Sequence, residues 1–171
     1  MVGIIVYGSL IDANETASQD LGVIDSFPVK VMGYRRSFNL MPSWREGSGR
    51  SIAVLNVECS PDHWINGVCL LLESCELAAL DVRERGYNRE GVPAETVECY
   101  PQHDLPENIS FFIYVGKEEK IDLRILPNSD YLDICIAGAL SRGEDFCAEF
   151  MTTTFLASGK PLQEYIDHNK I

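Results

Sequence analysis

The sequence predicts an α+β domain, because segments with strand composition come first and most helix signals come last. About six segments are rich in β-branched, aromatic or apolar residues and are bounded by turn-forming residues. The 171 residues, 46% of them hydrophobic, suffice for one domain with a substantial core, and no linker, repeat or low-complexity tract divides them. We therefore expect a single domain over residues 1–171, with a helical C-terminal segment from about residue 144.

The predicted strands follow from composition and from the turn residues between them. They cover residues 2–6, 29–40, 51–59, 64–73, 92–100 and 111–115. The run Ser-Pro-Asp-His at 60–63 predicts a turn between the third and fourth strands. Gly67 then falls inside a strand, where a glycine marks a bulge or a close approach of two backbones.

Capping and stop residues indicate where the helices begin and end. The predicted helices cover residues 74–86, 128–143, about 144–157 and a short segment from 161. Ser74 is the expected N-cap of the first helix and Gly86 its C-terminal stop. Gly159 and Pro161 mark the end of the third helix and the start of the fourth.

The net charge of −12 and the pI near 4.6 limit the possible partners. Nucleic acid and anionic membranes both require a basic face, so the sequence predicts neither as a partner. An anionic ligand would need local positive charge, and the candidates are Arg35, Arg36, Arg45 and Arg50. The alternative is that these arginines are solvated at strand ends and in the loop at 41–50, which is long enough to form a rim or lid.

The apolar segments and the cysteines predict a cytoplasmic protein. The first apolar segment is shorter than the core of a secretory signal and has no basic region before it. No apolar stretch is long enough to span a bilayer. The cysteines form no C-x-x-C pair, so we expect buried free thiols in a reducing compartment rather than disulfides or a zinc site. They are Cys59, Cys69, Cys75, Cys99, Cys135 and Cys147.

A corner after the first strand is the first candidate for a functional site. Tyr7, Gly8, Ser9 and Leu10 break the apolar run abruptly, and such a corner exposes several backbone N–H groups. Converging N–H groups suit a carboxylate or a developing oxyanion, and Gly8 lets main chain and ligand approach closely. The same four residues also have the composition of an ordinary turn.

Glu84 is the second candidate, because of its position in the predicted helix 74–86. At about 100° per residue it projects between Leu77 and Leu80, on the apolar face. A buried carboxyl must be paired or have a raised pKa, and a raised pKa is what a general base requires. The alternatives are an ion pair with an arginine or fraying near Gly86, and Asp81 lies almost as near to that face.

Other catalytic machinery is not indicated by the sequence. It has no G-x-S-x-G, Walker, G-x-G-x-x-G or H-E-x-x-H motif. The histidines, at 63, 103 and 168, fall in predicted turns or near the terminus, so Ser9 has no evident base. We therefore expect no metal and no nucleotide cofactor.

Several motifs taken in order resemble the γ-glutamylcyclotransferase superfamily. They are the Tyr-Gly-Ser-Leu corner at 7–10, Gly-Tyr-Arg-Arg-Ser-Phe at 33–38, Ile-Asn-Gly-Val at 65–68, and Glu84 after a Leu-rich helix. Residues 130–139 are similar to the corresponding segment of the cytosolic members. Residues 85–88 are only partly like either these or the ChaC-type, glutathione-specific members, so the resemblance leaves subfamily and substrate open.

The resemblance implies a mixed, partly closed β-barrel flanked by helices, with a cavity capped by the corner at 7–10. It places the catalytic glutamate on Glu84 and the substrate-binding backbone on Gly8, Ser9 and Leu10, with Tyr7 opening the same loop. It also implies a substrate contact for Tyr131, although this tyrosine could equally be part of the core at a helix start. It implies no cofactor, and a small γ-glutamyl compound as partner.

The implied reaction suits these residue types. The α-amine of a γ-glutamyl compound attacks its own γ-carbonyl and closes a ring to 5-oxoproline, so the enzyme has to fold the substrate and move protons. Two alternatives stay open at this point. One is a binding module for a small acidic metabolite that does no chemistry, and the other is the same acyl transfer on a γ-glutamylamine rather than a peptide.

Overall fold

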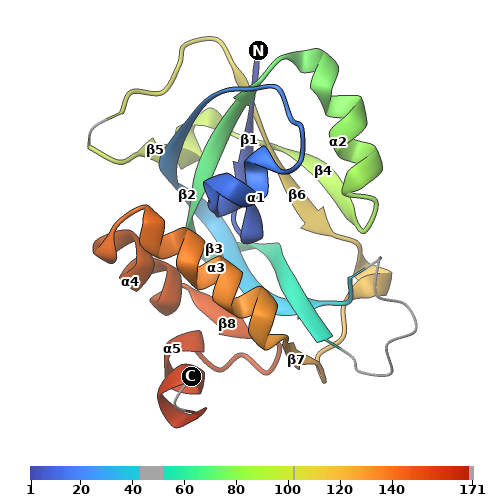
Figure 1. Ribbon diagram of the computed structural model, residues 1–171, viewed down its shortest axis with the longest axis vertical. Helices are drawn as coiled ribbons and strands as arrows, with labels where there is room; N and C mark the ends of the chain where they lie inside the picture. The colour runs from blue at the N-terminus through green and yellow to red at the C-terminus, as the bar shows by residue number, and fades with distance from the viewer. Residues whose placement is uncertain (43–51, 102, 170–171) are drawn as a thin grey trace.

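The computed structural model describes residues 1–42, 52–101 and 103–169, and shows in them a mixed sheet of eight strands flanked by helices (Figure 1). The main path of the sheet has the order β4-β6-β1-β3-β2-β5, while β7 pairs with β3 and β8 with β2. The sheet does not close, since β4 and β5 end its path. The predicted α+β class is confirmed. The strands are β1 (Val2–Val6), β2 (Val23–Leu40), β3 (Ile52–Leu72), β4 (Tyr87–Val92), β5 (Val97–Cys99), β6 (Ser110–Gly116), β7 (Leu126–Pro127) and β8 (Thr154–Leu156).

Two long antiparallel strands, β2 and β3, form the centre of the sheet. The predicted turn at 60–63 is wrong, because β3 continues through it. The register passes from Met32 opposite Trp64 to Tyr34 opposite Cys59, so residues 60–63 form a bulge opposite Gly33, whose φ is +85°. The turn-forming residues at 60–63 thus distort the strand without ending it.

The core lies between the sheet and the helices that cover it. β1 is buried along its whole length, between β3 on one side and β6 on the other. Gly67 lies in β3 beside the end of its antiparallel partner β1, and a Cβ atom built on Gly67 would be 2.6 Å from the carbonyl oxygen of Val6. The predicted close approach of two backbones at Gly67 is confirmed.

The helices differ from the prediction mainly at their ends. The predicted helix 74–86 is a 3₁₀ turn, η2 (Ser74–Glu76), followed by α2 (Leu77–Arg83), and the cap of the turn is Glu73 rather than Ser74. A short helix, α1 (Ala13–Ala17), was not predicted. α3 (Ser129–Ser141) was predicted correctly, with the Asn128 side chain accepting a hydrogen bond from the Tyr131 N–H. The remaining helical elements are η1 (Ser9–Ile11), η3 (Ala94–Thr96), η4 (Glu118–Lys120), α4 (Glu144–Thr152) and α5 (Leu162–Asn169).

Two further predictions were wrong, namely the end of the helix at 144–157 and the extent of the strand at 92–100. The predicted helix 144–157 ends at Thr152, and residues 154–156 form β8, which runs parallel to β2. β-branched residues disfavour helix, and the hydroxyls of Thr153 and Thr154 donate to carbonyls of the last helical turn. The predicted strand 92–100 is divided by Pro93, which begins the turn η3, because proline cannot donate to a strand ladder.

The cysteines are free thiols, but not all of them are buried. Cys69 and Cys135 are buried as expected, whereas Cys59 and Cys75 are exposed, which corrects the expectation for those two. In the part of the chain that the structure describes, no helix is both long and apolar enough to cross a membrane.

Replacement of Gly67 by alanine tests the contact between β1 and β3. The added methyl group would collide with backbone, so we expect Gly67→Ala to lower the free energy of unfolding by about 1–3 kcal/mol. Gly91→Ala in β4 is the matched control: no described atom lies within 4 Å of its Cβ position, and we expect an unchanged or slightly higher stability. Denaturant unfolding of both variants would decide, and equal stabilities would contradict the crowding at Gly67.

Candidate functional site

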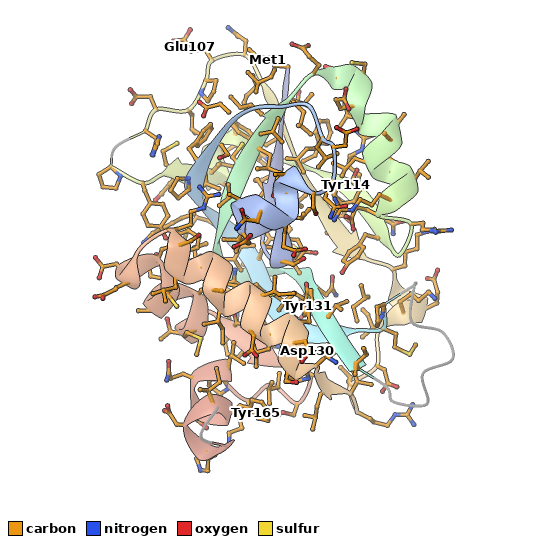
Figure 2. All side chains as sticks on the ribbon, in the orientation of Figure 1. Met1, Glu107, Tyr114, Asp130, Tyr131 and Tyr165 are labelled. Atoms are coloured by element: carbon orange, nitrogen blue, oxygen red, sulfur yellow. The ribbon has the colours of Figure 1, made fainter. Side chains whose placement is uncertain are left out.

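A cavity of about 380 Å³ lies where β1 ends, between α2 and the start of α3. It brings together residues that are far apart in the sequence. Tyr114 lines it on the side of α2, and Tyr131, beside Asp130, lines it from the start of α3 (Figure 2). The predicted site residues all line this one cavity: Tyr7, Gly8, Ser9, Leu10, Glu84 and Tyr131.

The corner at 7–10 turns directly from β1 into the 3₁₀ turn η1. The Ile11 N–H donates to the Gly8 carbonyl at 3.0 Å. The first N–H groups of such a turn have no acceptor inside it. Among the described residues, none of the backbone hydrogen bonds outside strands and helices uses the N–H groups of Gly8, Ser9 or Leu10. Gly8, Ser9 and Leu10 all line the cavity, so a ligand there would lie beside this stretch of backbone.

Gly8 leaves room for the close approach of the Tyr131 hydroxyl. A Cβ atom built on Gly8 would lie 2.8 Å from the Tyr131 hydroxyl oxygen, so a larger residue there would displace the hydroxyl. The ring of Tyr131 contacts Phe38 edge to face, with 6.2 Å between centroids. Packing therefore holds the ring in place, and its hydroxyl lies against the backbone of the corner.

Three other tyrosines that line the cavity donate their hydroxyl hydrogens to acceptors within the protein. Tyr7 donates to the Tyr114 carbonyl at 2.5 Å, Tyr87 to the Leu55 carbonyl at 2.9 Å, and Tyr114 to the Asp81 carboxylate at 2.7 Å. Burial raises the pKa of each of these phenols, and of Tyr131 as well. All four hydroxyls are therefore protonated at neutral pH.

Glu84 occupies the C-cap of α2, one residue beyond the helix, and 19% of its side chain is exposed. Burial raises the pKa of its carboxyl, and the Arg83 guanidinium, 3.4 Å away, only partly offsets this. Both alternative interpretations of the sequence are thus partly realised, since Glu84 pairs with an arginine and lies at the helix end. It nevertheless lines the cavity.

Asp81 and Glu84 have different partners in the structure. Asp81 accepts two hydrogen bonds from the Arg89 guanidinium at 3.0 and 3.1 Å, and a third from Tyr114. It is exposed and does not line the cavity. Of the two carboxyls near the apolar face of the predicted helix, Glu84 is the one that meets the cavity.

The arginines singled out by the sequence are not at the cavity. Arg36 is fully buried outside it, and Arg35 lies over the Phe155 ring and pairs with Glu58 at 3.6 Å. Arg45 and Arg50, with residues 43–50 of the predicted loop at 41–50, lie outside the described residues. Among the described residues, the arginine that lines the cavity is Arg83, which the sequence analysis missed.

Other lining residues were missed as well, although two of them lie close to Glu84 in the sequence. Arg83 precedes Glu84 and Tyr87 follows it, so the segment around the glutamate carried a signal that was not used. Asp130 likewise precedes Tyr131, whereas Glu15 and Tyr114 gave no sequence signal, because tertiary structure alone brings them to the wall.

Histidines and metal ligands do not contribute to this site in the described chain. His63 accepts from or donates to the Ser60 hydroxyl and contacts Phe155, and His103 stacks on Phe27. Within residues 1–42, 52–101 and 103–169, no group of three or more His, Cys, Asp or Glu side chains is arranged to hold a metal ion.

Comparison with known proteins shows similarity at the level of structure. No family model and no curated protein matches the sequence. A solved structure described as a γ-glutamyl cyclotransferase matches with a TM-score of 0.68 and 16% identity, over 99% of this chain and 98% of that one. An uncharacterized protein from Homo sapiens matches with a TM-score of 0.66 and 16% identity, over 99% and 98% of the two chains.

A γ-glutamyl cyclotransferase from yeast, described as specific to glutathione, also matches. Its TM-score is 0.52 and its identity 17%, over 99% of this chain and 85% of that one. At these identities the matches establish the fold. The chain has the fold of solved γ-glutamyl cyclotransferases, as the resemblance in the sequence predicted.

The raised pKa of Glu84 predicts a pH-dependent cost in stability. A group whose pKa is higher in the folded than in the unfolded state favours folding below its ordinary value of 4.5, and this contribution is lost as the pH rises through the folded pKa. Glu84→Gln cannot ionise, so we expect it to be more stable than the wild type at pH 7 and equal to it below pH 4.5.

Chemical denaturation at several pH values would measure this difference, with Glu107→Gln as control. Glu107 is exposed and far from the cavity (Figure 2). A Glu84→Gln variant that is less stable than the wild type at pH 7 would show that Glu84 is held by a stabilising ion pair instead.

Proposed function

We propose that this protein is a γ-glutamylcyclotransferase-type enzyme that releases 5-oxoproline from a γ-glutamyl peptide or amine. The observation that carries the proposal is the position of Glu84, a carboxyl of raised pKa that shares one cavity with the N–H groups of the corner at 7–10. The similarity to solved γ-glutamyl cyclotransferases supports the same reaction class.

The reaction requires proton transfer and orientation. Glu84 takes a proton from the α-ammonium group of the substrate, and the free amine then attacks the γ-carbonyl carbon, forming the ring C–N bond. As the original amide C–N bond breaks, Glu84 returns this proton to the leaving nitrogen. The ring nitrogen then gives its second proton to the Glu84 carboxylate, which leaves the single N–H of 5-oxoproline, and the released amine takes that proton from Glu84 to leave as an ammonium ion. A glutamate of raised pKa suits both steps, since it is a stronger base as a carboxylate and remains able to donate once protonated.

Negative charge on the substrate is met by N–H groups and one guanidinium. The backbone N–H groups of Gly8, Ser9 and Leu10 hold the γ-carbonyl oxygen as it becomes an oxyanion. Arg83 lies beside Glu84 and supplies the positive charge for the α-carboxylate of the glutamyl group. Its pair with Glu84 has an Nε to Oε1 distance of 3.4 Å, which is loose enough to be exchanged for a substrate contact.

The remaining features agree with a small substrate. A cavity of about 380 Å³ is in the range of small-molecule sites. Tyr131 contributes a protonated hydroxyl beside Gly8 and orients the substrate. The free thiols favour the cytoplasm as the compartment in which the enzyme works.

Release of 5-oxoproline from purified protein tests the proposal directly. The substrates are glutathione, γ-glutamyl dipeptides and γ-glutamylamines, and we expect turnover of at least one of these classes. Glu84→Gln keeps the shape of the side chain and removes proton transfer, so we expect it to lower kcat by roughly 10²–10⁴-fold with the fold intact. Glu107→Gln should behave as the wild type. Binding of these compounds without any turnover would favour a module that does no chemistry.

The contact between Gly8 and Tyr131 predicts two coupled effects on activity. We expect Tyr131→Phe to lower kcat/KM by about 0.5–1.5 kcal/mol, the usual net value of one hydrogen bond, with little change in Tm. Gly8→Ala should lower kcat/KM in the wild type, because the methyl group displaces the Tyr131 hydroxyl. In the Tyr131→Phe background, that hydroxyl is absent and the effect of Gly8→Ala should be smaller.

Kinetics of the two single variants and the double variant would measure this coupling. Strictly additive effects would show that the Gly8 backbone and the Tyr131 hydroxyl act separately. Equal loss of stability and activity in Gly8→Ala would indicate an ordinary structural turn.

A further inference from the structure

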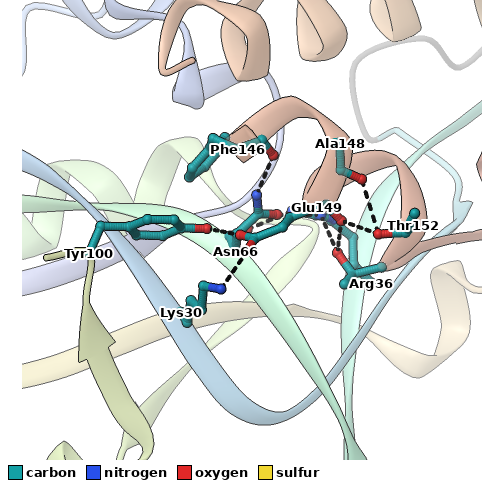
Figure 3. A network of polar contacts seen from close by, with 9 residues as sticks. Lys30, Arg36, Asn66, Tyr100, Phe146, Ala148, Glu149 and Thr152 are labelled. Atoms are coloured by element: carbon teal, nitrogen blue, oxygen red, sulfur yellow. Dashed lines mark hydrogen bonds and ion pairs between the residues drawn. The ribbon is translucent and has the colours of Figure 1, made fainter. Parts of the chain in front are cut away.

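Arg36 is a fully buried cation that lies behind the corner at 7–10, on β2. Its guanidinium donates hydrogen bonds to six oxygen atoms, and none of the six belongs to a carboxylate. They are the carbonyl oxygens of Tyr7, Asn66 and Phe150, the side-chain oxygen of Asn66, and the hydroxyls of Thr153 and Thr154. Figure 3 shows Arg36 and Asn66 next to α4.

The charge of Arg36 is stabilised by the C-terminal end of α4. The Phe150 carbonyl belongs to the last turn of that helix, where the helix dipole is negative. The Phe150 ring lies 4.0 Å from the guanidinium carbon and adds a cation–π contact. Burial lowers the pKa of Arg36 to about 9, so the side chain remains positively charged at neutral pH.

The bond from Arg36 to Tyr7 acts on the cavity through a single peptide group. The Tyr7 carbonyl, 3.4 Å from an Nη atom of Arg36, and the Gly8 N–H belong to the same planar peptide unit. Positive charge at the oxygen end of a peptide group polarises it and makes its N–H a stronger donor. The Gly8 N–H is one of the groups to which the proposed function assigns the developing oxyanion.

We propose that Arg36 is a positioning residue that fixes and polarises the peptide group between Tyr7 and Gly8, and so strengthens the Gly8 N–H as an oxyanion donor. This inference rests on the proposed function for its catalytic consequence. Arg36 itself does not line the cavity. Its effect reaches the reaction only through the backbone of the corner.

Two variants weaken this link and one serves as control. Arg36→Lys keeps the positive charge but loses the planar fork of donors. Thr153→Val removes a hydroxyl 3.0 Å from the guanidinium and nearly preserves the volume, which covers the case in which Arg36→Lys fails to fold. Thr152→Val is the matched control, because the Thr152 hydroxyl is exposed and donates to the carbonyls of Ala148 and Glu149 (Figure 3).

Two readouts are needed for each variant. In protein labelled with ¹⁵N-glycine, we expect the amide proton signal of Gly8 to move upfield in Arg36→Lys and Thr153→Val and to stay in place in Thr152→Val. We expect kcat for 5-oxoproline release to fall about 10-fold in Arg36→Lys, less than the roughly 10²–10³ lost with a whole oxyanion donor, and KM to change by less than about twofold.

The outcomes separate this inference from the proposed function. An unchanged Gly8 signal in folded Arg36→Lys, or in Thr153→Val if Arg36→Lys does not fold, would overturn the inference, because the Gly8 N–H would then not depend on the Arg36 guanidinium. A shifted signal with unchanged kcat would overturn the catalytic part of it. If the wild type releases no 5-oxoproline from any γ-glutamyl compound, the proposed function fails, and the Gly8 signal alone then decides whether Arg36 polarises the corner.

Discussion

The buried guanidinium of Arg36 joins elements that lie far apart in the sequence. Its hydrogen-bond acceptors come from the end of β1, from β3, from α4 and from the start of β8, so these elements meet at one charge. Leaving a buried charge without partners costs several kcal/mol. The loss of any one acceptor therefore destabilises the contacts that Arg36 makes with the other elements. The same side chain holds the carbonyl at the point where β1 turns into the cavity wall. The packing of the core and the position of the corner at 7–10 therefore depend on the same side chain.

Glu84 has the opposite relation to stability. Arg36 is surrounded by oxygen atoms that accept its hydrogen bonds, whereas the Glu84 carboxyl is largely buried beside one loosely held guanidinium, that of Arg83. Its carboxylate is less well solvated than it would be in water, and folding opposes its ionisation. A residue that folding disfavours in its charged form is typical of functional sites. Glu84 stays at the cavity despite this cost. Neighbouring contacts, such as the ion pair of Asp81 in α2 with Arg89 in β4, hold the end of the helix in place.

Local chemistry in the sequence predicted much of the fold and the cavity, and the errors have physical causes. The break after β1 and the start of α3 near Asn128 were correct, because each depends on neighbouring residues. The close approach at Gly67 was correct because a glycine inside a strand leaves room for a second backbone. The turn at 60–63 was wrong, because a strand as long as β3 absorbs turn residues as a bulge. Arg36 was taken for a possible ligand of an anion, since a sequence does not show that hydroxyls and carbonyls some 118 residues away will surround it.

The pairing of β8 with β2 has a consequence for the order in which the molecule is completed. β8 lies at residues 154–156, and it pairs in parallel with residues 36–38 of β2. During synthesis, Arg36 leaves the ribosome long before Phe150, Thr153 and Thr154 exist to accept its hydrogen bonds. Until these residues are made, the Arg36 guanidinium lacks the hydrogen-bond acceptors that they supply, and its contact with the Tyr7 carbonyl at the corner is not held in place. The contacts of Arg36 are thus completed only after residues 150–154 have been made, although the corner that they support is formed by residues 7–10.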